Sequence, residues 1–249
     1  MGEVVALLQL NPTVGDIESN VAKIERAAAL AASNGASVAW TCELAVCGYP
    51  PRDLLLEDGF VEQCQVAASA VDSPIPLLVG SPIDSGSERT KPANGAVRVG
   101  PGGSGEVTCR KQLLPTYDVF DEVRYFEPNL DAGLATAAGM HLGVTICEDA
   151  WQHVGDVPSD YRTDPIEQLR SGSSATGRSN SPSTSQRAPI TLPRRASAQR
   201  WQEPPQPPSA TRSHCAIRSV ATTTSSSTAA HWSHGPTEPS CRRPAGAWA

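Results

Sequence analysis

The content of large apolar residues changes abruptly near residue 170, and this break limits what the chain can fold into. Residues 1–170 contain 43 Leu, Ile, Val and Phe residues, whereas residues 171–249 contain only 4. A segment so poor in apolar side chains cannot bury enough surface to offset the entropy lost on ordering its backbone. We therefore expect a folded domain in residues 1–170 and a disordered, low-complexity tail in residues 171–249.

The charge and cysteine patterns exclude several classes of protein. The formal net charge is −6, with +7 in the tail and −13 in residues 1–170, which does not favour binding to nucleic acid or an anionic membrane. No apolar run approaches the roughly 20 residues of a membrane-spanning helix. The seven cysteines form no CxxC pair, so neither a disulfide scaffold nor a metal site is expected. The N-terminus lacks the basic start of a signal peptide, and we expect a cytoplasmic protein.

Strand-like and helix-like segments alternate along residues 1–170. Asp16 can cap a helix that Gly35 would end. This alternation, followed by a hairpin near residues 95–111, predicts an α/β fold with mixed sheets. The expected helices are residues 17–33 and 52–70, and the expected strands are 3–10, 38–40, 75–80, 95–99, 106–111 and 142–146.

A reactive side chain follows each of three predicted strands, where α/β folds often place active sites. These side chains are Glu43, Lys111 and Cys147. A thiol nucleophile needs a base to take its proton, and a cation or N–H donors to stabilise the developing oxyanion. The three residues supply one group of each kind.

Four motifs around these residues resemble one known family. They are QLNPTVGDI, ELAVCGYPPRDLL, KQLLPTYDVFDEVRYFEP and ICEDAW, which occur in this order. The segment from residue 4 to about 170 resembles the nitrilase, or carbon–nitrogen hydrolase, superfamily. It is most similar to the glutaminase domain of bacterial glutamine-dependent NAD(+) synthetases. The resemblance implies part of a four-layer α-β-β-α sandwich.

The same resemblance implies roles for individual residues. Cys147 would attack the side-chain amide of glutamine, and Glu43 would act as the general base and then as the acid for departing ammonia. Lys111 would orient the carboxylate and hold the oxyanion, helped by the backbone N–H that follows Cys147. Tyr117 would line the glutamine pocket, and Tyr49 and Glu148 are further pocket candidates, with Glu148 meeting the substrate α-ammonium.

The resemblance stops near residue 171, where the family's NLSASP-like and NDxLVFDG-like motifs should follow. SPSTSQRAP (181–189) and ATTTSSSTA (221–229) stand near these places. Both can be written in codons that spell ALNLSASP and NDDLVFDG when read from the third base. The same offset restores both motifs in the right order, which makes a frameshift near residues 168–180 our leading hypothesis.

A second departure is the absence of an SGGxDS-like phosphate loop. ATP and deamido-NAD would bind a synthetase domain that this sequence does not contain, so we expect no cofactor here. Members of the family would form homo-oligomers, but we expect the surfaces responsible to be partly missing from this chain and its scaffold to fold poorly. Two alternatives remain open. One is a standalone amidase of the same superfamily, and the other is a non-enzymatic, partner-binding protein with a basic disordered tail.

Overall fold

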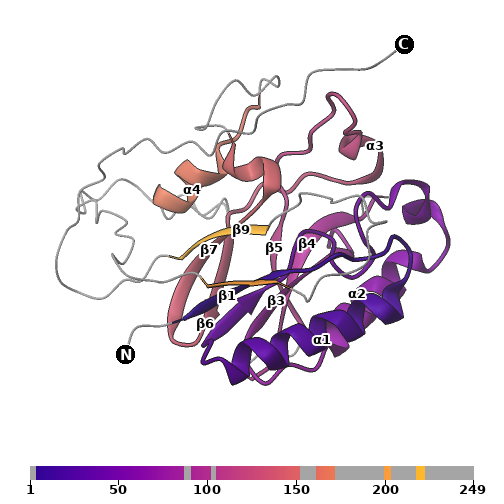
Figure 1. Ribbon diagram of the computed structural model, residues 1–249. Coiled ribbons are helices and arrows are strands. Elements are labelled where there is room, and N and C mark those ends of the chain that lie inside the picture. The colour runs from indigo at the N-terminus through magenta and orange to yellow at the C-terminus, as the bar shows by residue number, and fades with distance from the viewer. Residues whose placement is uncertain are drawn as a thin grey trace, which may run out of the picture.

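The computed structural model describes residues 4–86, 91–101, 105–151, 161–171, 199–202 and 217–221. Within these ranges the chain forms a larger and a smaller β-sheet with helices packed against them (Figure 1). The predicted α/β fold with mixed sheets is confirmed. None of the described helices is both long and apolar enough to cross a membrane.

The larger sheet has the strand order β5-β4-β3-β2-β1-β8, in which β8 spans Gln199–Gln202. Strands β1, β2 and β3 run parallel to one another. Strand β4 is antiparallel to β3, and β5 is antiparallel to β4. The central strand β3 is buried along its whole length, because it has a covered face on both sides. The strands are β1 (Val5–Gln9), β2 (Val38–Trp40), β3 (Leu77–Ile83), β4 (Ala93–Val99) and β5 (Glu106–Arg110).

Alternate residues of these strands belong to two different cores. In β2, Ala39 packs into a core with the helices, whereas Val38 and Trp40 pack into a core with the smaller sheet. In β3, Leu77 packs into the core with the helices, and Leu78 packs into the core with the smaller sheet. Successive side chains of a strand point to opposite faces, so the larger sheet forms the middle layer of the fold.

Two helices, α1 (Ile17–Ser33) and α2 (Phe60–Ala70), cover one face of the larger sheet. Helix α1 has the bounds predicted from sequence. Asp16 caps it by accepting a hydrogen bond from the backbone N–H of Ser19 at 3.2 Å. Gly35 follows its end with a φ of +83°, a conformation that favours glycine. The predicted end signals of this helix are therefore confirmed.

The helix expected over residues 52–70 is wrong as one element. The structure has a short 3₁₀ helix, η1 (Arg52–Leu56), followed by a break and then α2. Gly59 lies at the break with a φ of +77°, which interrupts a continuous right-handed helix. The apolar spacing on each side of the break is helical, so periodicity alone does not reveal it.

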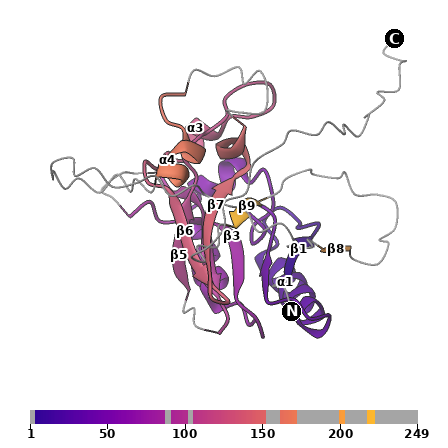
Figure 2. The same ribbon diagram turned by 90° about the vertical axis from the view of Figure 1, so that its left-hand side faces the viewer.

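The smaller sheet has the order β6-β7-β9, in which β9 spans Ile217–Ala221. It packs on the face of the larger sheet opposite α1 and α2 (Figure 2). Strand β6 (Gly133–Ala137) was not predicted; its exposed and buried residues alternate along small side chains that give a weak apolar signal. Strand β7 (Met140–Ile146) begins two residues before the predicted strand and ends where expected.

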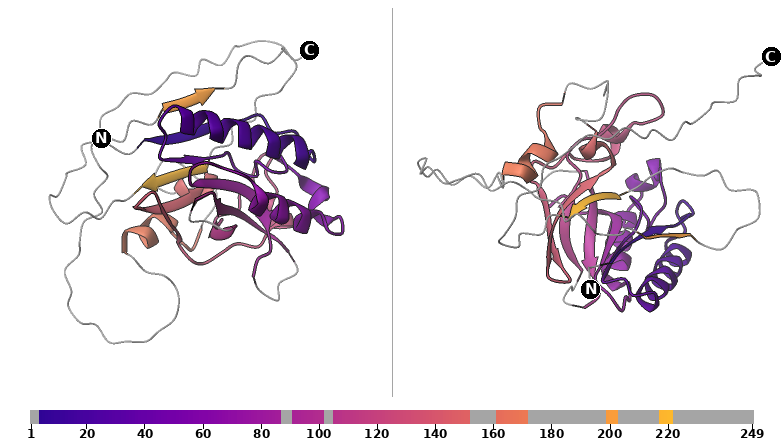
Figure 3. Two further views of the ribbon diagram at one scale, coloured as in Figure 1. Left: turned by 90° about the horizontal axis from the view of Figure 1, so that it is seen from below. Right: turned by 60° about the vertical axis from the view of Figure 1, so that its left-hand side comes forward.

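The prediction of a disordered tail concerns mostly residues that the structure does not describe. The two exceptions are β8 (Gln199–Gln202) and β9 (Ile217–Ala221). Strand β8 pairs in parallel with β1, and β9 pairs antiparallel with β7, so each extends a sheet at its edge (Figure 3). An unpaired sheet edge presents free backbone N–H and C=O groups that readily pair with any extended segment.

Three short helices complete the described fold. Helix α3 (Glu122–Tyr125) lies in the long connection between the two sheets, and the 3₁₀ helix η2 (Cys147–Ala150) follows β7 directly. Helix α4 (Pro165–Ser171) contacts β7 and η2. The order of layers is therefore helices, larger sheet and smaller sheet, with α4 beside the smaller sheet.

Candidate active site

The three predicted catalytic residues follow the ends of three strands that the two packed sheets bring together. Glu43 lies three residues after β2, Lys111 directly follows β5, and Cys147 directly follows β7. Strands β2 and β5 belong to the larger sheet and β7 to the smaller one. The site therefore depends on the face-to-face packing of the two sheets.

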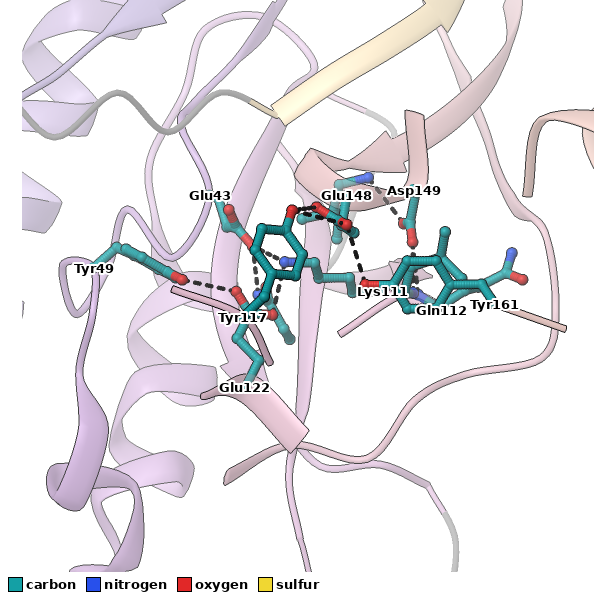
Figure 4. A network of polar contacts seen from close by, with 12 residues as sticks. Glu43, Tyr49, Lys111, Gln112, Tyr117, Glu122, Glu148, Asp149 and Tyr161 are labelled. Carbon is teal, nitrogen blue, oxygen red and sulfur yellow. Dashed lines mark hydrogen bonds and ion pairs between the residues drawn. The ribbon is translucent and has the colours of Figure 1, made fainter. Parts of the chain in front are cut away.

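Lys111 lies at the centre of a buried ionic network (Figure 4). Its Nζ is 2.8 Å from Oε1 of Glu43 and 2.7 Å from Oε2 of Glu122. The side chains of Lys111 and Glu43 have no exposed surface, and Glu122 is 5% exposed. A buried ammonium ion is stable only when charged partners replace its water shell, and two carboxylates do so here.

Glu122 is a member of this network that the sequence analysis did not single out. It lies within the quoted motif KQLLPTYDVFDEVRYFEP, eleven residues after Lys111, and begins helix α3. Its other oxygen, Oε1, accepts a hydrogen bond from the hydroxyl of Tyr49 at 2.9 Å. The neighbouring sequence is rich in charges, which is typical of a solvent-exposed turn, so only the fold shows that Glu122 is buried.

The charges of this network shift the pKa values of its members. Burial alone would lower the pKa of Lys111, but the neighbouring carboxylates of Glu43 and Glu122 more than offset this and raise it well above its usual value. Burial raises the pKa of Glu122 to about 7, although Lys111 acts in the opposite direction. Lys111 therefore stays an ammonium ion, whereas Glu122 titrates near neutral pH.

The two oxygens of Glu43 have different surroundings. Oε1 accepts hydrogen bonds from Lys111 and, at 2.7 Å, from Nδ2 of Asn94 on β4. Oε2 is buried and has no hydrogen-bond partner among the described residues. A buried carboxylate oxygen without a donor is costly, and such atoms often mark places where a ligand or a reaction supplies the partner. Oε2 is thus the oxygen available to take a proton.

Cys147 has an unusual backbone conformation, with a φ of +47° directly after β7. Non-glycine residues seldom adopt this region, and such strained residues cluster at functional sites. The side chain is partly exposed, unlike the buried thiols of Cys42, Cys47, Cys64 and Cys109.

Several groups act on the Cys147 thiol. Burial is the main cause that raises its pKa to about 12; the carboxylate of Glu43 adds to this effect, and Lys111 opposes it. The charges of Glu43 and Lys111 thus act on this thiol in opposite directions. At neutral pH the thiol is protonated at rest, so a nucleophilic attack by this sulfur requires a base that removes its proton during the reaction.

Glu148 lies beside the nucleophile position and is held by two phenols. The hydroxyl of Tyr117 lies 3.0 and 2.9 Å from its two carboxylate oxygens, and that of Tyr161 lies 3.1 Å from Oε1. Tyr117 and Glu148, which were predicted separately as pocket residues, are thus in direct contact. Tyr161 is a further member that has no signal in the sequence. Glu148 is 4% exposed, so its charge can act strongly on a nearby cation.

Asp149 ties the ends of β5 and β7 together. Oδ1 accepts hydrogen bonds from the backbone N–H groups of Gln112 and Leu113 at 3.0 and 2.8 Å, and Oδ2 accepts one from Ile146 at 3.0 Å. These bonds fix the backbone directly after Lys111 relative to the backbone on both sides of Cys147.

No cluster of three or more His, Cys, Asp or Glu residues suited to a metal ion occurs in the described part of the chain.

Comparison with known proteins identifies the family. The carbon–nitrogen hydrolase family model matches residues 4–154, a range that includes Glu43, Lys111 and Cys147. The chain belongs to the carbon–nitrogen hydrolase family. The resemblance seen in the four sequence motifs is thereby confirmed, and the chain carries a domain homologous to the glutaminase part of glutamine-dependent NAD(+) synthetases.

The curated relatives are much longer than the matched segment. The glutamine-dependent NAD(+) synthetase of Synechocystis sp. is 44% identical over 155 residues, which are 59% of this chain and 28% of that protein. The one from Thermotoga maritima is 37% identical over 155 residues, or 60% of this chain and 26% of that protein. The chain therefore spans less than a third of the length of these relatives.

A solved structure shows the same fold. The glutamine-dependent NAD(+) synthetase from Acinetobacter baumannii superposes with a TM-score of 0.55 and 31% sequence identity. The superposition covers 67% of this chain and 30% of that one. The nitrilase-type fold predicted from sequence is thus confirmed for the covered part.

Proposed function

We propose that this carbon–nitrogen hydrolase domain hydrolyses the side-chain amide of glutamine, with Cys147 as the nucleophile, Glu43 as the general base and Lys111 as the cation that holds the oxyanion. The observation that carries the proposal is the buried Lys111–Glu43 ion pair, in which Oε2 of Glu43 has no donor among the described residues. Both charges also act on the partly exposed thiol of Cys147. Homology to glutamine-dependent synthetases supports glutamine as the substrate.

The first half of the reaction forms a thioester. Oε2 of Glu43 takes the thiol proton while the Cys147 sulfur attacks the amide carbon, and the former carbonyl oxygen becomes an oxyanion. Lys111 and the backbone N–H of Glu148 stabilise this charge. Glu43 then gives the proton to the amide nitrogen, the C–N bond breaks, and ammonia leaves. Because the pKa of the thiol is about 12, this proton transfer is essential, and a positioned base contributes about 10²–10⁴-fold in rate.

The second half returns the enzyme to its starting state. Glu43 removes a proton from a water molecule that attacks the thioester carbon, the C–S bond breaks to release glutamate, and Glu43 returns the proton to the departing sulfur, which restores the thiol. Glu148 is suited to bind the α-ammonium of glutamine, because its buried carboxylate is fixed by the hydroxyls of Tyr117 and Tyr161. Tyr49 belongs to the proposed active site through its contact with Glu122, the second carboxylate that contacts Lys111.

In its relatives the domain is part of a larger synthetase. We propose that the ammonia formed here serves NAD(+) synthesis from deamido-NAD, for which a separate ATP-binding domain would be needed. ATP and deamido-NAD would bind that domain and not the residues described here.

The proposal is tested by measuring glutamate and ammonia released by the purified full-length chain. We expect glutamine to be hydrolysed faster than asparagine or simple aliphatic amides, and Cys147→Ser to abolish the activity. Cys64→Ala removes a fully buried thiol from the core between α2 and the larger sheet, and this variant should retain the glutaminase activity. Equal rates with wild-type and Cys147→Ser protein would refute the proposed nucleophile, and preference for a simple amide would favour a standalone amidase.

A further inference from the structure

We propose that Tyr49 is a positioning residue for Lys111: its hydroxyl fixes the carboxylate of Glu122, and this carboxylate in turn holds the lysine ammonium in place. The inference rests on the proposed function, since it assigns a task within the same reaction. Sequence analysis had placed Tyr49 only among the residues that line the glutamine pocket. The contact that the structure shows points to a different task.

The two oxygens of Glu122 are each bound by one donor. Oε2 accepts from Nζ of Lys111 at 2.7 Å, and Oε1 accepts from the hydroxyl of Tyr49 at 2.9 Å. Figure 4 shows the contact of Tyr49 ending on Glu122, whereas that of Tyr117 ends on Glu148. Tyr49 is therefore connected to the lysine side of the site, and Tyr117 to the side proposed to bind the substrate.

The phenol of Tyr49 stays protonated over the working pH range. Burial, with the nearby carboxylates of Glu122 and Glu43, raises the pKa of Tyr49 well above its usual value, so the phenol stays protonated and can donate. A hydrogen bond to the ionised form of a carboxyl group lowers its pKa. Tyr49 thus acts together with Lys111 to keep Glu122 ionised, against the burial that favours its protonation.

Other charged groups face Glu122 as well. Glu43 raises its pKa, and Glu122 in turn acts on the Cys147 thiol. A pocket of about 310 Å³ is lined by Tyr49, Glu122 and three further charged residues, namely Arg52, Asp121 and Arg124. The opposite charges of these three partly cancel, and the two short contacts with Lys111 and Tyr49 remain the specific ones.

The loss of the Tyr49 hydroxyl has a defined consequence. In Tyr49→Phe, Glu122 loses a donor to its ionised form, so its pKa rises. Over the pH range between the old and the new pKa, Glu122 is then protonated, and Lys111 loses one of its two charged acceptors. We expect kcat to fall at neutral pH and to recover at higher pH, while KM for glutamine stays close to the wild-type value.

Two independent measurements on the full-length chain test this inference. The first is the titration of the Glu122 carboxyl by ¹³C NMR of glutamate-labelled protein, with the signal assigned by Glu122→Gln. The second is the pH profile of kcat and KM for glutamine hydrolysis. We expect Tyr49→Phe to move the Glu122 midpoint and the acid limb of kcat upward together, by at least about half a pH unit.

Two other tyrosines provide matched Tyr→Phe variants. Tyr125→Phe removes a hydroxyl that donates to Asp53 at 2.7 Å on the surface, and should change neither measurement. Tyr117→Phe should raise KM and leave the acid limb in place. In a Glu122→Gln background, Tyr49→Phe should have no further effect on the pH profile, because the group through which it acts no longer titrates.

The outcomes separate this inference from the proposed function. A Glu122 midpoint that is unchanged in Tyr49→Phe, or that moves equally in Tyr125→Phe, would overturn the positioning role. So would a midpoint that moves while the acid limb of an active enzyme stays in place. If the wild-type chain hydrolyses no glutamine but the midpoint moves as expected, the link between Tyr49 and Glu122 stands and the proposed function fails.

Discussion

The ammonium group of Lys111 is the central charge of the site, because the carboxylates of Glu43 and Glu122 both contact it. The contact with Glu43, at 2.8 Å, is the one that the motifs lead us to expect. Both Glu43 and Lys111 influence the pKa of the Cys147 thiol. The catalytic roles of these residues remain predictions, because geometry shows proximity and charge but not turnover.

Other members of the site were not singled out from the sequence, although Glu122 and Asp149 lie within two of the quoted motifs. Glu122, Asn94 and Asp149 are polar residues with no characteristic spacing, and each becomes important only when folding buries it beside a partner. A lone acidic residue in a charged stretch is most often exposed, so local sequence favours the wrong environment for Glu122. Burial of polar groups is decided by tertiary packing, which a local pattern does not contain.

At the scale of elements, strongly periodic segments were predicted best. Helix α1 and strand β2 have the predicted bounds, because one has a capped amphipathic repeat and the other a short run of apolar residues. Helix α2 was merged with η1, since the glycine between them interrupts a pattern that is apolar on both sides. Strand β6 was missed because alanine, glycine and threonine dominate its sequence.

The two faces of the β6–β7 hairpin lead to a prediction about packing. Leu142 on β7 is 1% exposed and packs against the larger sheet, whereas Leu134 on β6 is 57% exposed. We expect Leu142→Ala to lower the free energy of unfolding by about 2–5 kcal/mol through loss of burial and creation of a cavity. Leu134→Ala, the same change on the other face, should cost less than about 0.5 kcal/mol.

Urea denaturation of the two variants provides the measurement. Both leucines belong to the β6–β7 hairpin, so any general effect of shortening a side chain in this hairpin should lower the stability of the two variants equally. Similar losses of stability in the two variants would contradict the face-to-face packing of the sheets, on which the site depends.

The whole molecule consists of two regions with very different compositions. The family model ends at residue 154, and the low content of large apolar residues begins soon after, near residue 171. On the outer face of the smaller sheet Leu134 is 57% exposed. A frameshift near residues 168–180 remains our hypothesis for the origin of the tail, as it accounts for both restored motifs with a single offset.

This hypothesis predicts a definite result for the coding DNA. A single inserted or deleted base near codons 165–185 should restore NLSASP-like and NDDLVFDG-like segments, followed by a phosphate loop of an ATP-binding domain. Sequencing of the genomic DNA through this region and beyond codon 249 tests this directly. A reading frame confirmed as written, without any such restoration downstream, would show that the tail is a genuine part of the protein.

Covalent labelling distinguishes a nucleophilic Cys147 in a glutamine-binding site from an ordinary thiol. The purified full-length chain is treated with 6-diazo-5-oxo-L-norleucine, a glutamine-shaped diazoketone whose nitrogen is displaced by a thiolate, and the labelled cysteine is located by peptide mass spectrometry. We expect one adduct, on Cys147, that excess glutamine prevents and that forms much more slowly in Glu43→Gln. Labelling of other cysteines to the same extent, or labelling of Cys147 that glutamine does not prevent, would contradict it.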